Sequence, residues 1–181
     1  MEETATDPAG EYAQTVRGRE RIFEHYADRC GTSNVLLRLN YAVEMRYGVL
    51  ADIGRKVYDR RPVDVTMGHV NVIWQGDANS VALRAFQLCS VPPAVLNVTG
   101  PEILRVRWIA QRFGELFGVA PLIEGTEAES ALLNDSGKCQ RLFGPAEFGV
   151  EQVIEWTAAW IRAGGASLNK PTHFEARDGK F

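Results

Sequence analysis

The chain has 181 residues, of which 45% are hydrophobic and 24% are charged, with a formal net charge of −3. This length and composition predict one packed domain with a sizeable core. The absence of a basic block argues against a nucleic-acid-binding surface, and no apolar run approaches the roughly 20 residues that span a bilayer.

The three cysteines, Cys30, Cys89 and Cys139, lie far apart and their number is odd. Neither a disulfide framework nor a zinc site is therefore expected, and no other cluster has metal-ligand spacing. The acidic, polar N-terminus lacks the pattern of a signal peptide. Together these features favour a reducing, cytoplasmic setting.

Predicted helices and strands alternate along the chain. A disordered leader over residues 1–10 precedes a helix that begins at Glu11 or Tyr12. In chain order, we expect a helix to residue 29, a strand over 34–43, a helix over 49–60, a strand over 70–73, a helix over 78–89, a strand over 94–98, a helix over 106–117, a strand over 120–123, helices over 137–143 and 150–162, and an extended polar tail over 166–181. This alternation predicts an α/β fold with parallel strands and crossover helices. Because so few strands are present, we expect the sheet to be incomplete, with one edge unprotected.

The strand predicted over 34–43 is nearly continuous in apolar residues, as in a strand buried on both faces of a parallel sheet. Arg38 interrupts it. A charge within such a strand requires a partner, and the sequence offers Glu20 or Asp77. Asp77 is also a candidate N-cap for the helix over 78–89.

Nothing in the chain matches a dinucleotide-binding turn. No G-x-G-x-x-G follows a predicted strand, so the glycine-rich turn that holds a pyrophosphate at a helix N-terminus is missing. The chain alone is therefore not expected to bind a dinucleotide tightly.

Four segments carry a family resemblance. Residues 12–16, Y-A-Q-T-V, together with Glu20 look like the motif Y-x-x-x-K…E, and residues 37–41, L-R-L-N-Y, look like L-R-x-x-N-x-Y-G-P. Residues 71–79, N-V-I-W-Q-G-D-A-N, stand in the place of I-H-V-D-D-V-A. Residues 97–100, N-V-T-G, look like Y-N-x-G. With this order and spacing, residues 12–162 resemble the C-terminal portion of an extended short-chain dehydrogenase/reductase of the NAD-dependent epimerase/dehydratase family.

The resemblance implies an incomplete Rossmann-like parallel sheet plus the family's small substrate-binding region, over residues 11–165. It also implies an NAD or NADP cofactor, with Tyr12 as the catalytic acid/base and Asn40 and Tyr41 near the nicotinamide and substrate. Trp74 and Gln75 are candidate substrate-binding residues, with core packing as the alternative for Trp74.

The active-site helix departs from the family pattern at one position. The family's lysine lies four residues after the tyrosine, on the same helix face, and lowers a phenol pKa that is otherwise near ~10. Here that position holds Val16, which has no charge. Arg19 returns to the same face one turn later, about 10 Å along the axis from Tyr12.

Three interpretations remain open. The chain is the substrate-side portion of an NAD(P)-dependent epimerase, dehydratase or reductase, acting on a nucleotide sugar or similar hydroxylated metabolite and inactive alone. Alternatively it is a non-catalytic module that binds another protein or forms a homodimer through the helix over 12–29, whose apolar face includes Phe23 and Tyr26. Lastly, it is a degenerate remnant of the family.

Overall fold

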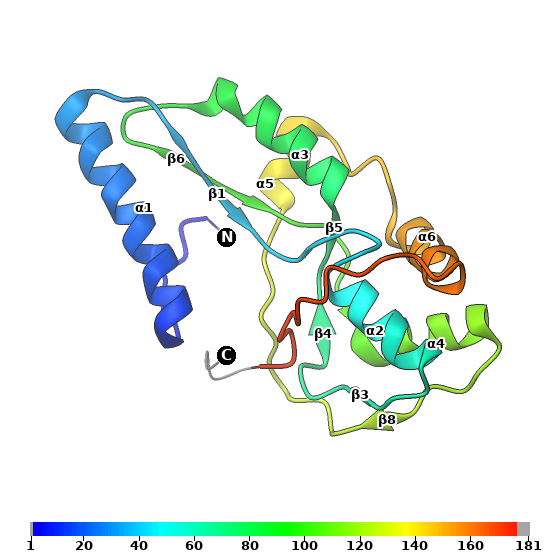
Figure 1. Cartoon of the computed structure of the whole chain (residues 1–181). Helices are drawn as coiled ribbons and strands as arrows, with labels where there is room; N and C mark the ends of the chain where they lie inside the picture. The colour runs from blue at the N-terminus through cyan, green and yellow to red at the C-terminus, as the bar shows by residue number, and fades with distance from the viewer. Residues whose placement is uncertain (1, 177–181) are drawn as a thin grey trace.

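The computed structural model describes residues 2–176 and has the α/β character expected from the sequence (Figure 1). The elements are α1 (Gly10–Cys30), β1 (Val35–Leu39), β2 (Ala42–Val43), α2 (Val49–Tyr58), β3 (Val63–Asp64), β4 (His69–Val70), β5 (Ile73–Trp74), α3 (Gln75–Arg84), the 3-10 helix η1 (Ala85–Leu88), β6 (Ala94–Val98), β7 (Leu104–Arg105), α4 (Val106–Phe117), β8 (Ile123–Glu124), α5 (Gly137–Phe143) and α6 (Val150–Arg162).

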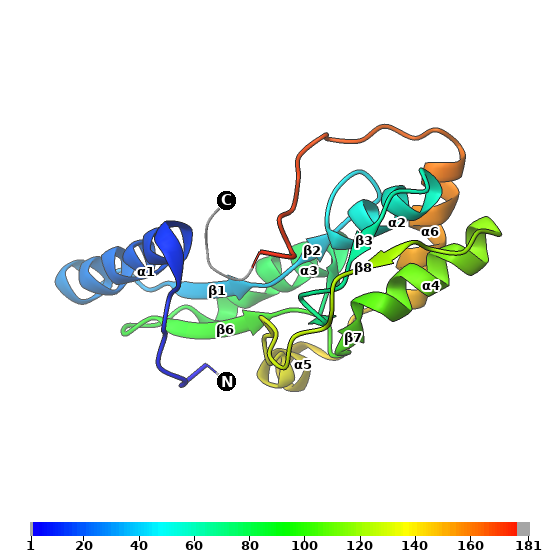
Figure 2. The ribbon, with the colours of Figure 1, turned by 90° about the horizontal axis from the view of Figure 1, so that it is seen from below.

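The strands pair only two by two within residues 2–176. The longest pair joins β1 and β6 in parallel, in a register that runs from Val35 opposite Ala94 to Leu39 opposite Val98. β2 pairs with β5 and β3 with β8, both in parallel, whereas β4 and β7 are antiparallel. Figure 2 shows α1 running beside β1 on the side away from β6. The sheet is therefore an incomplete parallel one, as predicted.

The short strands differ in detail from those predicted. The predicted strand over 34–43 is two strands, because Tyr41 adopts φ 44 and interrupts the extended backbone between β1 and β2. The predicted strand over 70–73 is likewise divided, with residues 71–72 separating β4 from β5, and the strand expected over 120–123 is β8, at Ile123–Glu124.

The helices follow the predicted pattern more closely. α1 and α4 end at Gly31 and Gly118, whose φ values of 66 and 70 are left-handed and favour glycine. The prediction for Asp77 was wrong. α3 begins three residues earlier than predicted, at Gln75, so Asp77 lies within its first turn. The Asp77 carboxylate instead accepts hydrogen bonds from the backbone amides of Glu147 and Phe148, at 3.3 and 3.2 Å.

Two apolar clusters hold the fold together. The larger lies among α2, α4 and α6, around Leu50, Ile109, Phe113 and Ile154, all with 0% exposure. The smaller lies between α3 and the β1–β6 pair and includes Leu96. α1 belongs to neither cluster, since Glu20 and Ala27 are its only buried residues.

The last described residues return to the larger cluster, where Phe174 is 1% exposed. Residues 177–181 of the predicted tail lie outside the described residues. The three cysteines are free thiols. Among the described residues, no helix is long and apolar enough to cross a membrane.

Candidate functional site

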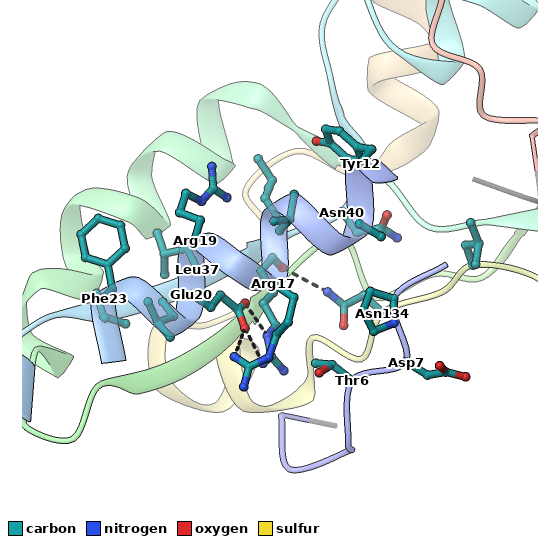
Figure 3. A pocket seen from close by; sticks show the side chains of 18 of the residues that line it. Thr6, Asp7, Tyr12, Arg17, Arg19, Glu20, Phe23, Leu37, Asn40 and Asn134 are labelled. Carbon is teal, nitrogen blue, oxygen red and sulfur yellow. Dashed lines mark hydrogen bonds and ion pairs between the residues drawn. The ribbon is translucent and has the colours of Figure 1, made fainter. Parts of the chain in front are cut away.

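A groove of about 840 Å³ lies between α1 and β1 (Figure 3). We call it the α1–β1 groove. Its lining consists of residues 34–40, the loop residues 132–134, the leader residues 6–8 and one side of α1. The carboxyl end of β1 opens into it, which is where open α/β sheets bind ligands.

Two of the predicted site residues meet in this groove. Tyr12, in the first turns of α1, and Asn40, immediately after β1, lie at the same end of it, and Phe23 lies at the other end. Tyr12 is 65% exposed. α1 positions the phenol beside the end of β1, because α1 leads directly into that strand and lies along it.

Among the described residues that line the groove with Tyr12, the positively charged side chains are arginines. Val16, one turn on, lines the groove with an apolar side chain. Arg17 is engaged by Glu20 at 3.0 Å and by Glu24 at 2.9 Å. Arg19 also lines the groove, is exposed, and makes no ion pair within residues 2–176. It is therefore the arginine of this helix that is available to a negative charge in the groove.

Three asparagines fix the end of β1, and the sequence analysis assigned no role to two of them. Asn71 is only 2% exposed. Its side-chain oxygen accepts hydrogen bonds from Asn40 Nδ2 at 2.8 Å and the Asn134 amide at 3.3 Å, and its Nδ2 donates to the Asn134 carbonyl at 2.6 Å. The Asn134 side chain in turn donates to the Arg38 carbonyl. The only sequence signal was a set of amides in three separate loops.

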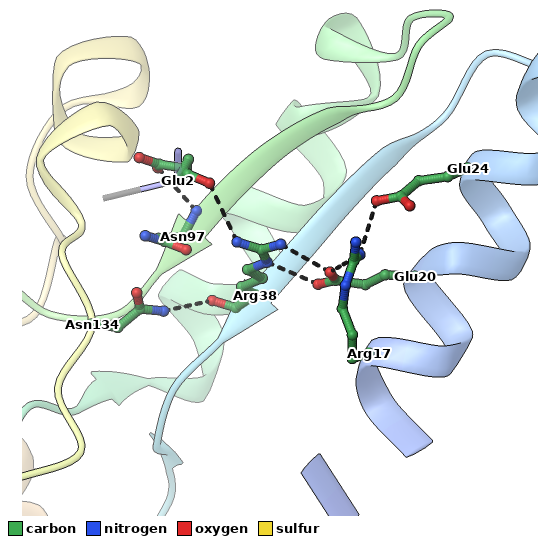
Figure 4. A network of polar contacts seen from close by, with 7 residues as sticks. All are labelled: Glu2, Arg17, Glu20, Glu24, Arg38, Asn97 and Asn134. Atoms are coloured by element: carbon green, nitrogen blue, oxygen red, sulfur yellow. Dashed lines mark hydrogen bonds and ion pairs between the residues drawn. The ribbon is translucent and has the colours of Figure 1, made fainter. Parts of the chain in front are cut away.

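A charge pair joins α1 to β1 (Figure 4). Arg38 Nε and Nη2 donate to the two carboxylate oxygens of Glu20 at 2.8 and 2.9 Å. Of the two partners that the sequence offered for Arg38, Glu20 is therefore the one that the structure shows. The hydrogen bonds from Arg38 hold the pKa of Glu20 below its ordinary value, although burial opposes the shift. The pKa of Arg38 is raised by the same contact.

The other predicted site residues lie outside this groove. Tyr41 packs half-buried against the larger apolar cluster, and burial raises the pKa of its phenol. Trp74 lines a separate cavity of about 90 Å³ and contacts Trp156 edge to face, with ring centroids 5.6 Å apart. Gln75 donates to Asn79 at the start of α3. Their assignments as cofactor- and substrate-binding residues stay predictions.

Two glycines at the start of helices are closed by neighbouring side chains. Gly48 is the N-cap of α2, and Gly76 is the second residue of α3. A Cβ on Gly48 would lie 2.9 Å from Val43 Cγ1, and one on Gly76 would lie 2.5 Å from Trp74 Nε1. These two glycines allow close packing within the chain, and neither leaves an open backbone turn at the start of its helix for a phosphate.

Comparison with known proteins gives a match in structure alone. No family model and no curated protein sequence matches the chain. The UDP-glucose 4-epimerase of Thermus thermophilus, in complex with NAD, is similar with a TM-score of 0.70 at 19% identity, over 83% of this chain and 53% of that one. The UDP-glucuronic acid 4-epimerase of Bacillus cereus, also with NAD, gives a TM-score of 0.76 at 14% identity, over 89% and 54%. The chain has part of the fold of these epimerases.

The same fold occurs in a reductase. The GDP-mannoheptose C4 reductase of Campylobacter jejuni, with NADP bound, has a TM-score of 0.69 at 16% identity, over 83% of this chain and 56% of that one. The chain thus spans little more than half of the length of these solved structures. This confirms the predicted fold class and agrees with the portion that the motifs indicated.

Proposed function

We propose that this chain is the substrate-side portion of an NAD(P)-dependent epimerase, dehydratase or reductase that acts on a nucleotide sugar or a similar hydroxylated metabolite. It belongs, in this proposal, to the NAD-dependent epimerase/dehydratase family. The observation that carries the proposal is the groove in which Tyr12 and Asn40 lie together at the carboxyl end of β1. Similarity to solved epimerases and a reductase supports it.

In this proposal, the residues of this chain hold a proton and position the ligand. When bound, the nicotinamide would supply the hydride step. Tyr12 would hold or move the proton of a substrate hydroxyl, and Arg19, about 10 Å further along α1, would be the cation on the same side of the groove. Asn40, held by Asn71, would position the ligand through its amide. We propose that the chain alone neither binds the dinucleotide tightly nor turns over, because no glycine-rich turn follows a predicted strand and the glycines at the starts of α2 and α3 are closed by side chains.

Two titrations test this function. In a calorimetric titration with NADH and NADPH, we expect no micromolar affinity. In NMR spectra, UDP-glucose at about 10 mM is expected to shift the side-chain amide signals of Asn40 and Asn134, as a millimolar ligand would. The shift should be lost in Asn40→Ala and retained in Asn79→Ala, an exposed amide on α3. Micromolar dinucleotide binding, or no shift of these amides, would contradict the proposal.

A second candidate is a non-catalytic module that forms a homodimer through α1. Ile22 and Tyr26 are 60% and 54% exposed and lie outside the groove lining. Such adjacent apolar side chains favour association. Light scattering should show a dimer that dissociates in Ile22→Glu and persists in Leu83→Glu, since Leu83 is 72% exposed on α3. A monomer at high concentration would refute this candidate.

We place the protein in the cytoplasm. Free thiols at all three cysteines and a nicotinamide-linked site both suit a reducing compartment.

A further inference from the structure

The segment that follows α6 folds back over α2 without forming a helix or a strand. It comprises residues 166–176, and Figure 1 shows it crossing α2 on its way back toward the middle of the molecule. We call this segment the tail strap. Its end lies beside Tyr41, a residue that the sequence assigned to the site and that the structure packs outside the groove.

One buried side chain and a few polar contacts hold the tail strap in place. Phe174 is the only one of its residues that is buried, and the ring enters the larger apolar cluster. The Asp52 carboxylate accepts hydrogen bonds from the Thr172 hydroxyl and, at 3.2 Å, from the Thr172 amide. Lys56 Nζ lies 3.7 Å from Glu175 Oε1. Because a partly exposed ion pair contributes little to stability, the attachment depends mainly on the buried ring.

The end of the tail strap covers Tyr41. The Tyr41 ring packs against the apolar cluster that includes Phe174. Burial raises the pKa of the Tyr41 phenol, and the negative charge of Glu175 raises it further. The Glu175 carboxylate therefore lies close to the phenol, and the tail strap helps to keep this group from solvent.

Backbone strain gathers at the same place. Four described residues other than glycine have a positive φ, and three of them are Tyr41, at 44°, and the tail-strap residues Asn169 and His173, at 52° and 50°. A left-handed backbone is unfavourable for a bulky side chain such as tyrosine, and it persists only where the surrounding structure imposes it. Such residues cluster at clamps and switch regions of proteins. A strained segment with a single buried side chain is expected to open before the core does.

Opening of the tail strap would change the ligand end of β1. Asn40 lines the α1–β1 groove, and Tyr41 is the next residue along the chain. The Asn40 amide donates to the Val98 carbonyl at 3.0 Å, and the Tyr41 carbonyl accepts a hydrogen bond from the Ile73 amide at 3.2 Å. These bonds to β6 and β5 hold the backbone of both residues independently of the tail strap. Its release would therefore expose the phenol and leave the groove intact.

We propose that the tail strap is a releasable cover of Tyr41. Closed, as in this structure, it keeps the phenol from solvent and from any ligand. Open, after Phe174 has left the larger apolar cluster, it presents the phenol at the end of β1, next to Asn40. This device controls access to one residue and does not depend on which ligand the groove binds.

Hydrogen exchange of the unaltered chain measures the opening. The Leu168 amide donates to the Arg46 carbonyl, and the Thr172 amide donates to Asp52. We expect both amides to be protected at least about tenfold less than the amide of Ile53, which lies in the core on α2. Their exchange should depend little on low denaturant, because opening exposes little apolar surface. If both amides instead share the protection and denaturant dependence of Ile53, the tail strap is a fixed part of the core and the proposal is overturned.

Chemical modification measures the cover. N-acetylimidazole transfers its acetyl group to the oxygen of accessible tyrosines, with release of imidazole, and mass spectrometry locates the product. Phe174→Ala should raise the rate at Tyr41 at least about tenfold, because the loss of a buried ring releases the tail strap. Tyr26, which is 54% exposed on α1, is the internal reference and should react equally in all variants. Leu168→Ala, which replaces an exposed side chain of the tail strap, is the matched control and should leave the rate at Tyr41 unchanged.

A second variant leaves the core intact. Thr172→Val combined with Lys56→Met removes side-chain contacts between the tail strap and α2, and should raise the rate at Tyr41 at least about threefold. A faster reaction of Tyr41 in either folded variant supports the proposal. The proposal is overturned if neither variant changes that rate, or if Tyr41 of the unaltered chain already reacts as fast as Tyr26. Since no nucleotide is involved, the result is independent of the titrations that test the function.

Discussion

The ion pair between Glu20 and Arg38 could be predicted only in part from the sequence. A guanidinium within an apolar strand requires a carboxylate, and the sequence offered Glu20 or Asp77. Only the three-dimensional arrangement decides between them, because it places α1 along β1 and directs Asp77 to the amides of residues 147 and 148. The need for a pair was predictable, whereas the identity of the partner was not.

We predict that the attachment of α1 to β1 depends on pH through Glu20. The folded chain holds the pKa of this carboxyl below its ordinary value, so the unfolded state binds the proton more readily. The stabilisation is therefore complete above the ordinary pKa of 4.5 and is lost as the pH falls through the lowered value. In Glu20→Gln, the loss should be about 2–3 kcal/mol at neutral pH, since the Arg38 charge loses its partner.

The measurement is the NMR shift of the buried Ala27 amide as the pH is lowered. Glu11→Gln, which replaces an exposed carboxyl of the same helix, is the control and should leave the transition unchanged. An unaltered transition in Glu20→Gln would contradict the prediction.

Asn71 was not identified from the sequence, because an amide in a loop gives no signal of burial. We predict that Asn71→Ala costs about 1–3 kcal/mol, since it removes a buried amide and leaves Asn40 Nδ2 and the Asn134 backbone without their partner. Urea denaturation measures this cost, and Asn79→Ala should cost less than about 0.5 kcal/mol, as for other surface changes. An equal loss of unfolding free energy in the two variants would show that the buried amide network stabilises the fold no more than an exposed amide does.

At the scale of elements, helices were predicted better than strands. α4 and α6 match their predicted bounds, because a long amphipathic stripe followed by a terminator specifies a helix. The strands of two residues carry no such pattern. An apolar run such as 34–43 does not reveal the left-handed backbone at Tyr41 that divides it. This interruption between β1 and β2 decides where the two predicted site residues lie, since Asn40 lines the groove and Tyr41 packs against the core.

Two glycines within helices should respond in opposite ways to substitution by alanine. A Cβ on Gly54 of α2 would lie 2.9 Å from Ile161 Cδ1 and 3.0 Å from the Phe113 ring. Gly54→Ala is therefore expected to destabilise the fold by about 1–3 kcal/mol through overpacking. In α1, a Cβ on Gly18 would meet nothing within 4 Å, so Gly18→Ala should stabilise that helix by about 0.5–1 kcal/mol. Thermal and urea denaturation, with circular dichroism as the signal, measure both, and effects of the same sign would contradict the packing described here.

For the whole molecule, burial is distributed unevenly. α4 buries five residues among twelve, whereas α1 buries two among twenty-one. Helices outside a core are marginal in water, and low burial marks the parts of a protein that open first. We predict that α1 detaches while α2, α4 and α6 stay folded, with an opening free energy lower by at least about 1.4 kcal/mol, which corresponds to tenfold faster amide exchange.

Native-state hydrogen exchange at low denaturant distinguishes this local opening from global unfolding. The α1 amides should exchange with little dependence on denaturant, because little apolar surface is exposed when this helix leaves β1. Glu20→Gln should accelerate exchange in α1 alone, whereas Gly54→Ala should accelerate it in α4 and leave α1 nearly unchanged. If α1 and α4 instead shared one opening free energy and one denaturant dependence, α1 would be part of the core unit. The same order of opening means that a ligand bound in the α1–β1 groove stabilises α1 first, since that helix and β1 form the two walls of the groove.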